Sequence, residues 1–235
     1  ALQLAERLIA SLNTAIALSG HRVRLGTSVG IAVADGSASG PEELLRNADL
    51  AMYRAKTGGR GAFAMFDTAM HARALERLTL EQDLGPAMGR DEFLLHYQPL
   101  VRAADRGLVG FEALLRWQRP GGRMVPPSDF IEVAEESGFI LTLGAWVLGE
   151  ACRQLAEWRS DGAANFMIGV NVSARQFADP GLLGYVESTL AACRMEPATL
   201  VLEITESTLM QHVTSSMETL AALRRLGVGI SVDDF

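Results

Sequence analysis

The chain has 235 residues, enough for one large domain or two smaller ones, and its 49% hydrophobic and 21% charged residues are those of an ordinary soluble globular protein. Its formal net charge of −7, from 28 acidic and 21 basic residues, argues against general attraction to duplex nucleic acid, but not against a small phosphate ligand in a locally basic pocket. The two cysteines, Cys152 and Cys193, have no metal-type spacing, and we expect them to be buried thiols rather than a disulfide, as in a reducing compartment.

The first 66 residues contain signals for both helices and short strands. In chain order we expect a helix at 2–17, one or two strands at 23–32, a loop at 35–40, a helix at 41–56 and a strand at 62–66. The helix at 41–56 has the clearest boundaries, because Pro41 suits a first helical position and Gly58 suits a helix end. Glu42 and Glu43 in its first turn complement the helix dipole.

Residues 67–90 have the pattern of one long helix. Its apolar side chains lie near one stripe, formed by Met70, Ala74, Leu75, Leu78 and Leu80. Several of its other positions are arginine or glutamate, which suits a solvated linker helix. We therefore expect a partial domain at 1–66, a linker helix at 67–90 and a second domain at 91–235.

From Asp91 onward the pattern changes to alternating strands and helices. The expected strands are 93–98, 108–115, 166–172, 200–205 and 228–233, and the expected helices between them are about 128–137, 142–160, 180–193 and 208–225. Several of these strands are continuous runs of Val, Ile and Leu, which is typical of parallel strands buried on both faces. The alternation predicts an α/β sheet or barrel.

Oxygen-bearing side chains recur near the ends of four predicted strands. These candidate metal ligands are Glu112, Asn171, Glu203, Asp233 and Asp234. Asn171 and Glu203 are 32 residues apart and Glu203 and Asp233 are 30 apart, so each spacing matches one strand–helix unit. In a barrel the carboxyl ends of the strands form the active-site face, where these side chains would meet.

The chemistry of this set points to a divalent cation. All five are oxygen donors, which suit Mg²⁺ or Mn²⁺, and a bound cation would offset the repulsion among the carboxylates. At a bent strand end, Asp233 and Asp234 could each meet a different metal ion. Two metal ions about 3.5–4 Å apart clamp a phosphoryl group and activate a water, so a phosphodiester is the natural substrate class. Taken singly, each acid could instead cap the following helix, and Asn171 could be a turn former.

Residues 91–235 resemble the EAL domain, the family of phosphodiesterases specific for cyclic-di-GMP. The signature is Glu112-Ala113-Leu114-Leu115-Arg116-Trp117. Further matches, in order, are His96-Tyr97-Gln98-Pro99, Pro127 with Phe130-Ile131, Ala134-Glu135-Glu136-Ser137-Gly138, Gly144-Ala145-Trp146-Val147-Leu148, Asn171-Val172-Ser173, Glu203-Ile204-Thr205-Glu206 and Asp233-Asp234-Phe235. Matches this numerous and in this order make a chance origin untenable.

The resemblance implies a modified TIM barrel, here an incomplete (β/α) barrel, that hydrolyses cyclic-di-GMP to pGpG. It implies that Glu112, Asn171, Glu203 and Asp233 ligate metal and that Asp234 serves the second metal and the attacking water. Gln98, Leu114 and Arg116 would contact the dinucleotide. The guanidinium fork of Arg116 also matches phosphate oxygens on physical grounds, although a surface salt bridge is its alternative role. Glu135 would support the site rather than ligate metal.

The N-terminal part resembles the second half of a GGDEF, or diguanylate cyclase, domain. The matching segments are Ser28-Val29-Gly30-Ile31-Ala32, Glu43-Leu44-Leu45, Ala48-Asp49-Leu50-Ala51-Met52-Tyr53-Arg54-Ala55-Lys56 and Gly59-Arg60-Gly61. Lys56 and Arg60 match residues that hold GTP phosphates in that family, and their alternative role is a solvated basic helix end. The Gly-Gly-Asp-Glu-Phe loop does not occur in the sequence, so we expect no synthesis of cyclic-di-GMP by this chain.

Several expectations concern a longer parent protein. The chain lacks an initiator Met and breaks off after Asp-Asp-Phe, before a lysine and a glutamate that the EAL pattern would add, so we expect a fragment that hydrolyses cyclic-di-GMP poorly by itself. Alternatives for the parent are a degenerate EAL sensor and a bifunctional cyclase/phosphodiesterase. We expect a cytoplasmic protein, with membrane attachment only through upstream segments, and EAL-mediated homodimerisation as an option.

Overall fold

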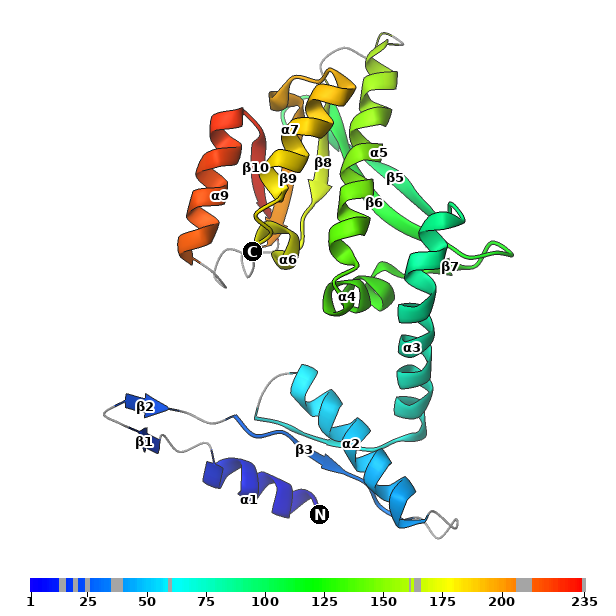
Figure 1. Ribbon diagram of the computed structural model, residues 1–235, viewed down its shortest axis with the longest axis vertical. Coiled ribbons are helices and arrows are strands. Elements are labelled where there is room, and N and C mark those ends of the chain that lie inside the picture. Colours follow the sequence, from blue (N-terminus) through cyan, green and yellow to red (C-terminus); the bar gives the residue numbers. More distant parts are fainter. Residues whose placement is uncertain are drawn as a thin grey trace. The chain divides into compact units, whose positions relative to one another are not determined.

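The chain forms two compact units, Ala1–Thr79 and Leu80–Phe235 (Figure 1). The computed structural model describes residues 1–12, 16–18, 21–23, 26–34, 40–58, 61–160, 162, 166–205 and 213–233. Within these ranges, no helix combines the length and the apolar character that a membrane crossing requires.

The first unit contains helices and short strands, as expected. Its elements are α1 (Leu2–Leu12), β1 (Ile16–Leu18), β2 (His21–Val23), β3 (Val29–Ile31), α2 (Pro41–Thr57) and β4 (Phe63–Met65). The predicted helix at 2–17 is correct for residues 2–12 and wrong for residues 16 and 17, because residues 16–18 pair antiparallel with residues 21–23, while residues 13–15 lie outside the described residues. Helical spacing of apolar residues cannot reveal such a pairing, since the hairpin gains its hydrogen bonds from a neighbouring segment.

Helix α2 packs directly on strand β3 because residue 30 is glycine. A Cβ atom at Gly30 would lie 1.9 Å from the Ala48 carbonyl oxygen and 2.3 Å from the Met52 nitrogen. The buried Ala51 and Ala55 keep the helix close to the strand. The helix begins at Pro41, and the Gly58 N–H donates to the Arg54 carbonyl oxygen at 3.0 Å, as the predicted boundaries require.

The second unit is an α/β structure built on one sheet, which confirms the predicted fold class. Its strands are β5 (Phe93–Val101), β6 (Leu108–Gln118), β7 (Met124–Val125), β8 (Met167–Asn171), β9 (Leu200–Thr205) and β10 (Gly229–Asp233). Its helices are α4 (Pro127–Ser137), α5 (Ile140–Ser160), α6 (Ala174–Phe177), α7 (Leu182–Cys193), the 3₁₀ turn η1 (Pro197–Thr199) and α9 (Val213–Leu226); α3 (Thr68–Gly89) leads into them. The short β7 and α6 are absent from the sequence-based prediction, and part of the helix predicted at 208–225 lies outside the described residues.

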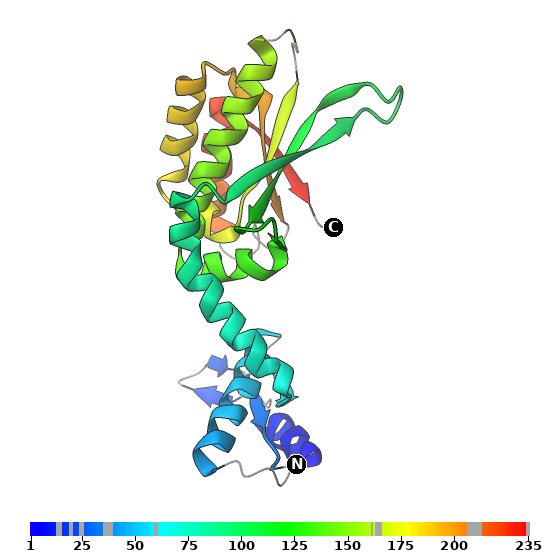
Figure 2. The same cartoon turned by 90° about the vertical axis from the view of Figure 1, so that its right-hand side faces the viewer.

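The strand order is β10-β9-β8-β6-β5, with β7 paired to β6. Strands β6, β8, β9 and β10 are parallel, as the strand–helix alternation predicts, whereas β5 and β6 form an antiparallel hairpin. Figure 2 shows the helices gathered on one side of this sheet and the β5–β6 hairpin extending beyond it. The hairpin strands run further than predicted, to Val101 and Gln118.

One face of the sheet is a hydrophobic core. In β9, Leu200, Leu202 and Ile204 are buried, while the residues between them are only half-buried. The buried set packs against core residues of α5, α7 and α9, such as Leu155, Val186 and Leu223. Burial on both faces is therefore found in the middle of β8, where Ile168, Gly169 and Val170 are buried in succession, whereas in β9 only the helix-covered face is fully buried.

A second core cluster lies where α3 meets the hairpin. Leu80, Leu84 and Ala87 are buried there with Phe93, Trp117 and Phe130, whose rings contact one another. The predicted apolar stripe of α3 is correct for Leu80, but Leu75 and Leu78 are 52% and 54% exposed.

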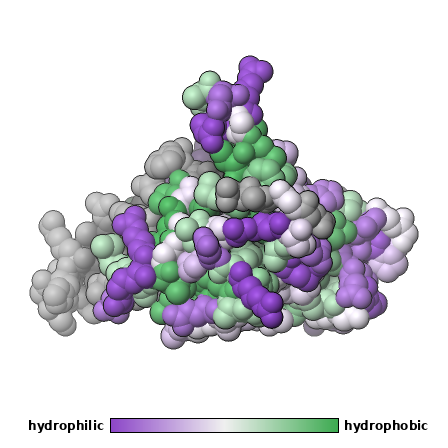
Figure 3. Space-filling model, turned by 90° about the horizontal axis from the view of Figure 1, so that it is seen from above, coloured by the Kyte–Doolittle hydropathy of each residue, from purple (hydrophilic) through white to green (hydrophobic). Residues whose placement is uncertain are grey.

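Figure 3 shows hydrophilic and hydrophobic side chains intermixed over the surface seen from above.

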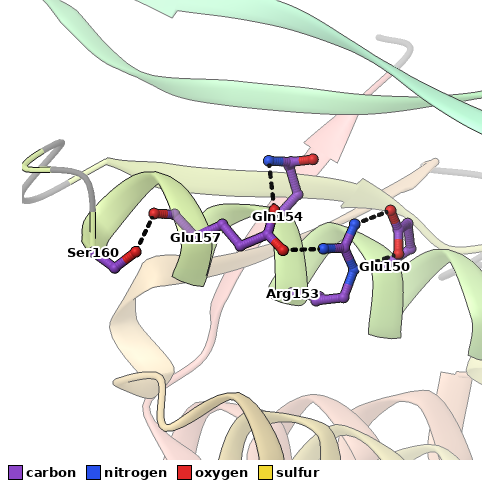
Figure 4. Close-up of polar contacts among 5 residues, drawn as sticks. All are labelled: Glu150, Arg153, Gln154, Glu157 and Ser160. Carbon is purple, nitrogen blue, oxygen red and sulfur yellow. Dashed lines mark hydrogen bonds and ion pairs between the residues drawn. The ribbon is translucent and has the colours of Figure 1, made fainter.

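A line of charged residues runs along the outer surface of α5. Figure 4 shows Arg153 between Glu150 and Glu157, with its Nη2 atom 2.6 Å from a Glu150 oxygen and its Nη1 atom paired to Glu157. Such exposed helix pairs contribute only about 0.3–0.5 kcal/mol each. Beneath them Tyr97 packs against Trp158, with ring centroids 4.8 Å apart, and burial raises the pKa of Tyr97 to about 12. Since Tyr97 faces α5, strand alternation turns its neighbour Gln98 to the opposite face.

Both cysteines are free thiols, as predicted. Cys152 is fully buried and Cys193 half-buried. Burial raises the pKa of the Cys152 thiol to about 12, so this group stays protonated and unreactive at neutral pH.

The buried Glu92 is expected to stabilise the second unit in a pH-dependent way. Its carboxylate accepts from Arg90 Nε at 2.5 Å and from Trp117 Nε1 at 2.9 Å, and the Arg90 hydrogen bond lowers the pKa of Glu92. The stabilisation is therefore present above the ordinary glutamate pKa and is lost as the pH falls through the lowered value. Glu92→Gln should cost about 1–2 kcal/mol at pH 7.

Thermal unfolding of wild type and Glu92→Gln at pH 7 and pH 3 measures this effect. The difference in unfolding temperature should shrink at the lower pH. Asp105→Asn, in an exposed pair with Arg102 at the hairpin tip, is the control and should change stability by no more than about 0.5 kcal/mol at either pH. An equal loss for Glu92→Gln at both values would contradict the expectation.

Candidate functional site

The sheet register brings the predicted ligands onto one face. Glu112 pairs with Gln98 on β5 and with Gly169 on β8, and Asn171 pairs with Glu203 on β9. Paired residues in neighbouring strands project to the same side, and alternate residues along each strand share that side. Gln98, Glu112, Asn171 and Glu203 therefore lie on the face opposite the hydrophobic core.

Three of these side chains gather around Gly169. The Asn171 Nδ2 atom donates to Glu112 Oε1 at 2.7 Å, so the amide oxygen is the atom of this side chain that a cation would bind. A Cβ atom at Gly169 would lie 2.2 Å from Glu203 Oε1 and 3.8 Å from the Glu112 Cα atom. Because residue 169 has no side chain, the Glu203 carboxylate can occupy the space above it and extend towards Glu112.

A cavity of about 370 Å³ opens beside this group. Four of the predicted site residues line it, namely Leu114, Arg116, Asn171 and Glu203. The rest of its wall comes mainly from α4 and α5 and is largely apolar, with Glu135 as an acidic exception. Gln98 and Glu112 do not line this cavity. They are paired with each other on β5 and β6, and Gln98 is exposed.

Arg116 is held with donors to spare. It is half-buried, and its Nη1 atom donates to the Leu115 carbonyl oxygen at 2.8 Å. No described acid forms an ion pair with it, so the geometry does not favour the surface salt bridge that was its alternative role. A guanidinium carries five N–H donors, and those left over can bind a phosphate in the cavity.

Glu135 is a half-buried carboxyl in the same cavity. Burial raises its pKa above the ordinary glutamate value, the neighbouring Glu132 and Glu136 raise it further, and Arg175 lowers it in part. Its backbone carbonyl oxygen accepts from Arg175 Nη1 at 2.5 Å, which fixes the end of α4 beside α6. Its proposed supporting role is compatible with this position.

The remaining predicted site residues are placed only in part. Asp233 is the last residue of β10, in register with Thr205, but its side chain lies outside what the structure describes, as does all of Asp234. Lys56 is exposed in the last turn of α2, and Arg60 falls outside the described residues. In the described part of the chain, no three His, Cys, Asp or Glu side chains are placed to hold a metal ion.

Two residues at the site, Gly169 and Gln176, were not predicted from the sequence, because the sequence-based prediction considered only side chains that could bind a metal or the dinucleotide. Gly169 interrupts the apolar run of β8, and a glycine inside a strand often marks a close approach. Gln176 follows Ser173 at the spacing of a capping box, in which Ser173 Oγ accepts from the Gln176 N–H and Gln176 Oε1 accepts from the Ser173 N–H. Both signals are present in the sequence, but neither residue offers a charged oxygen at a strand end, which is the feature that selected most of the candidate ligands.

Comparison with protein families identifies both parts of the chain. The EAL domain family matches residues 81–235, and the diguanylate cyclase GGDEF domain family matches residues 1–62. The expected tandem arrangement of the two families is thereby confirmed.

Curated relatives match almost the whole chain. The bifunctional diguanylate cyclase/cyclic di-GMP phosphodiesterase MucR of Pseudomonas aeruginosa is 44% identical over 99% of this chain and 34% of its own length. The cyclic di-GMP phosphodiesterase PdeR of Escherichia coli is 38% identical over 99% of this chain and 35% of its own length. The chain thus spans about a third of the length of the curated relatives it matches.

Solved structures with the same fold contain the dinucleotide. The PaMucR phosphodiesterase in complex with c-di-GMP is 45% identical, with a TM-score of 0.65 over 67% of this chain and 64% of that chain. The EAL enzyme Bd1971 in its cAMP- and cyclic-di-GMP-bound form is 29% identical, with a TM-score of 0.64 over 85% of this chain and 52% of that chain.

Proposed function

Because this chain belongs to the EAL domain family and carries part of a GGDEF domain before it, we propose that the gene product containing it hydrolyses cyclic-di-GMP to pGpG. The observation that carries the proposal is the meeting of Glu112, Asn171 and Glu203 on one sheet face beside the Arg116 cavity. Relatives that are named as cyclic di-GMP phosphodiesterases, and similar structures in complex with the dinucleotide, support it.

The gathered side chains fit a hard divalent cation, for which we propose Mg²⁺ or Mn²⁺. They offer two carboxylates and an amide oxygen around Gly169, without nitrogen or sulfur ligands. Asp233 and Asp234 would complete the set from the end of β10. When bound, two such cations would stabilise the charge that develops on the scissile phosphate and promote ionisation of a water.

The chain's own groups would bind and orient the dinucleotide. The guanidinium of Arg116 would hold a phosphate, while Leu114 and Gln98 would contact the nucleotide on either side of the Glu112 position. Asp234 would orient the water that attacks one phosphorus. The P–O3′ bond of that phosphate then breaks, which leaves a 5′-phosphate and a free 3′-hydroxyl in the linear product.

A second activity, the synthesis of cyclic-di-GMP, would require the complete GGDEF domain of the whole gene product. The relative MucR is named as bifunctional, and in this chain Lys56 and Arg60 would serve GTP phosphates of a complete GGDEF domain. We propose domains at 1–66 and 91–235 joined by a linker helix at 67–90, in a cytoplasmic protein that could pair through its EAL part. A degenerate EAL sensor is the alternative.

Turnover of the dinucleotide tests the proposed function. The full-length gene product, incubated with cyclic-di-GMP and Mg²⁺, should release pGpG, and chelation with EDTA should stop the reaction. Separation of the linear product by chromatography provides the measurement. Tight binding of cyclic-di-GMP without any linear product, in both Mg²⁺ and Mn²⁺, would favour the sensor alternative.

A further inference from the structure

The candidate ligand Asn171 lies at the end of a strand, where the backbone leaves the sheet. It is the last residue of β8, its side chain is exposed, and the chain leaves the sheet directly after it. The Val172 N–H still donates to the Glu203 carbonyl oxygen at 2.8 Å, but Ser173 already caps the next helix. The Asn171 amide is held on one side by its 2.7 Å hydrogen bond to Glu112 Oε1, and the position of the backbone that follows it depends on how the next helix is fixed.

Helix α6 cannot fix itself, because it has four residues. Helices this short are not stable alone, so tertiary contacts must hold it. Two side chains at adjacent positions supply these contacts. Arg175 reaches the end of α4, where its Nη1 atom donates to the Glu135 carbonyl oxygen at 2.5 Å, and Gln176 reaches α5.

Gln176 rests on the backbone of α5 at a glycine. A Cβ atom at Gly144 would lie 1.8 Å from Gln176 Nε2 and 2.6 Å from its Cδ atom, so the amide occupies the space that a side chain at residue 144 would need. Gln176 is only 9% exposed, and its Oε1 atom accepts from the Ser173 N–H at 3.1 Å. The same side chain therefore contacts α5 and the backbone two residues after Asn171.

This contact also forms part of the wall of the candidate site. Gly144, Val172 and Gln176 line the cavity of about 370 Å³ that contains Asn171 and Glu203. The same three residues line a second cavity of about 200 Å³ among α5, α6 and α7. Gln176 thus separates the two cavities, and its displacement would change the wall of the candidate site.

We propose that Gln176, seated on Gly144, is a positioning residue that holds the Asn171 amide in place to bind a divalent cation. This inference rests on the proposed function, in which Asn171 is a metal ligand. Residues that orient a metal ligand typically change metal affinity by about 10–100-fold when they are replaced. We expect Gln176→Leu, which removes the hydrogen bond to Ser173 but keeps the apolar bulk, to weaken Mn²⁺ binding by about 10-fold.

The experiment measures Mn²⁺ binding to the full-length gene product by electron paramagnetic resonance, without substrate. Gln176→Glu retains the capping-box acceptor and should keep the affinity within about 3-fold of wild type. Gly144→Ala should weaken binding as Gln176→Leu does, because the new methyl group displaces the amide. Gly149→Ala is the matched control on the same helix, since its Cβ atom would lie 3.9 Å from Tyr185 Oη, an ordinary contact.

The double variant Gly144→Ala/Gln176→Leu separates positioning from general destabilisation. If both changes act through the same contact, the double variant binds Mn²⁺ as weakly as Gln176→Leu alone. Thermal unfolding of each variant is recorded in parallel. A lower unfolding temperature with unchanged Mn²⁺ affinity in Gln176→Leu would overturn the inference. Absence of Mn²⁺ binding by the wild type would instead overturn the proposed metal site itself.

Discussion

Glu112→Gln is expected to reduce kcat/KM for cyclic-di-GMP by at least about 100-fold, which is the upper range for groups that merely orient a metal ligand. The substitution removes the negative charge that would bind the cation. It keeps an oxygen that can accept the Asn171 Nδ2 hydrogen bond, now 2.7 Å long, so the sheet around it should remain intact. The measurement is pGpG release by the full-length gene product, together with its unfolding temperature.

The control for this prediction is Glu132→Gln on α4. Glu132 is exposed and stands outside the cavity lining, but the substitution removes the same charge from the same unit. We expect its kcat/KM to stay within about 3-fold of wild type, as for surface substitutions away from a site. Turnover by Glu112→Gln within that same range would show that Glu112 does not bind the cation in the reaction.

The sequence allowed the ligand positions to be predicted because their spacing is a property of the chain itself. A strand–helix unit occupies about the 30–32 residues that separate Asn171, Glu203 and Asp233, and parallel strands place corresponding residues at one edge. The register confirms that Asn171 lies opposite Glu203. The roles of these residues as ligands stay predictions, and Asp234 lies outside the described residues.

What could not be predicted depends on contacts between distant segments. The β1–β2 hairpin gains its hydrogen bonds from a partner strand, and α6 depends on Gly144, 32 positions before Gln176 in the sequence. Local periodicity contains no information about either partner. Glycines in particular act by the space that they leave, and that space is visible only when the neighbouring chain is in place.

Gly169→Ala is expected to cause a second large loss of kcat/KM for cyclic-di-GMP, with a structural change that is confined to the site. The Cβ atom would lie 2.2 Å from Glu203 Oε1 and 3.1 Å from Glu203 Cδ, while the nearest backbone atom given, the Glu112 Cα, is at 3.8 Å, an ordinary contact. A carboxylate at the end of a flexible side chain can move away, so the sheet should fold, but Glu203 would no longer reach towards Glu112. We expect kcat/KM to fall by about 100-fold.

The matched control is Gly229→Ala on β10, in which the nearest atom to the new methyl group is Val201 Cγ2 at 3.1 Å. The Val201 Cγ2 methyl group has to shift by only a few tenths of an ångström, and no candidate ligand is displaced. Both variants should unfold within a few degrees of wild type, while only Gly169→Ala should lose pGpG release and Mn²⁺ binding together. If Gly169→Ala kept Mn²⁺ affinity and turnover, the Glu203 carboxylate would not belong to the metal site, and the ligand set would have to be built without β9.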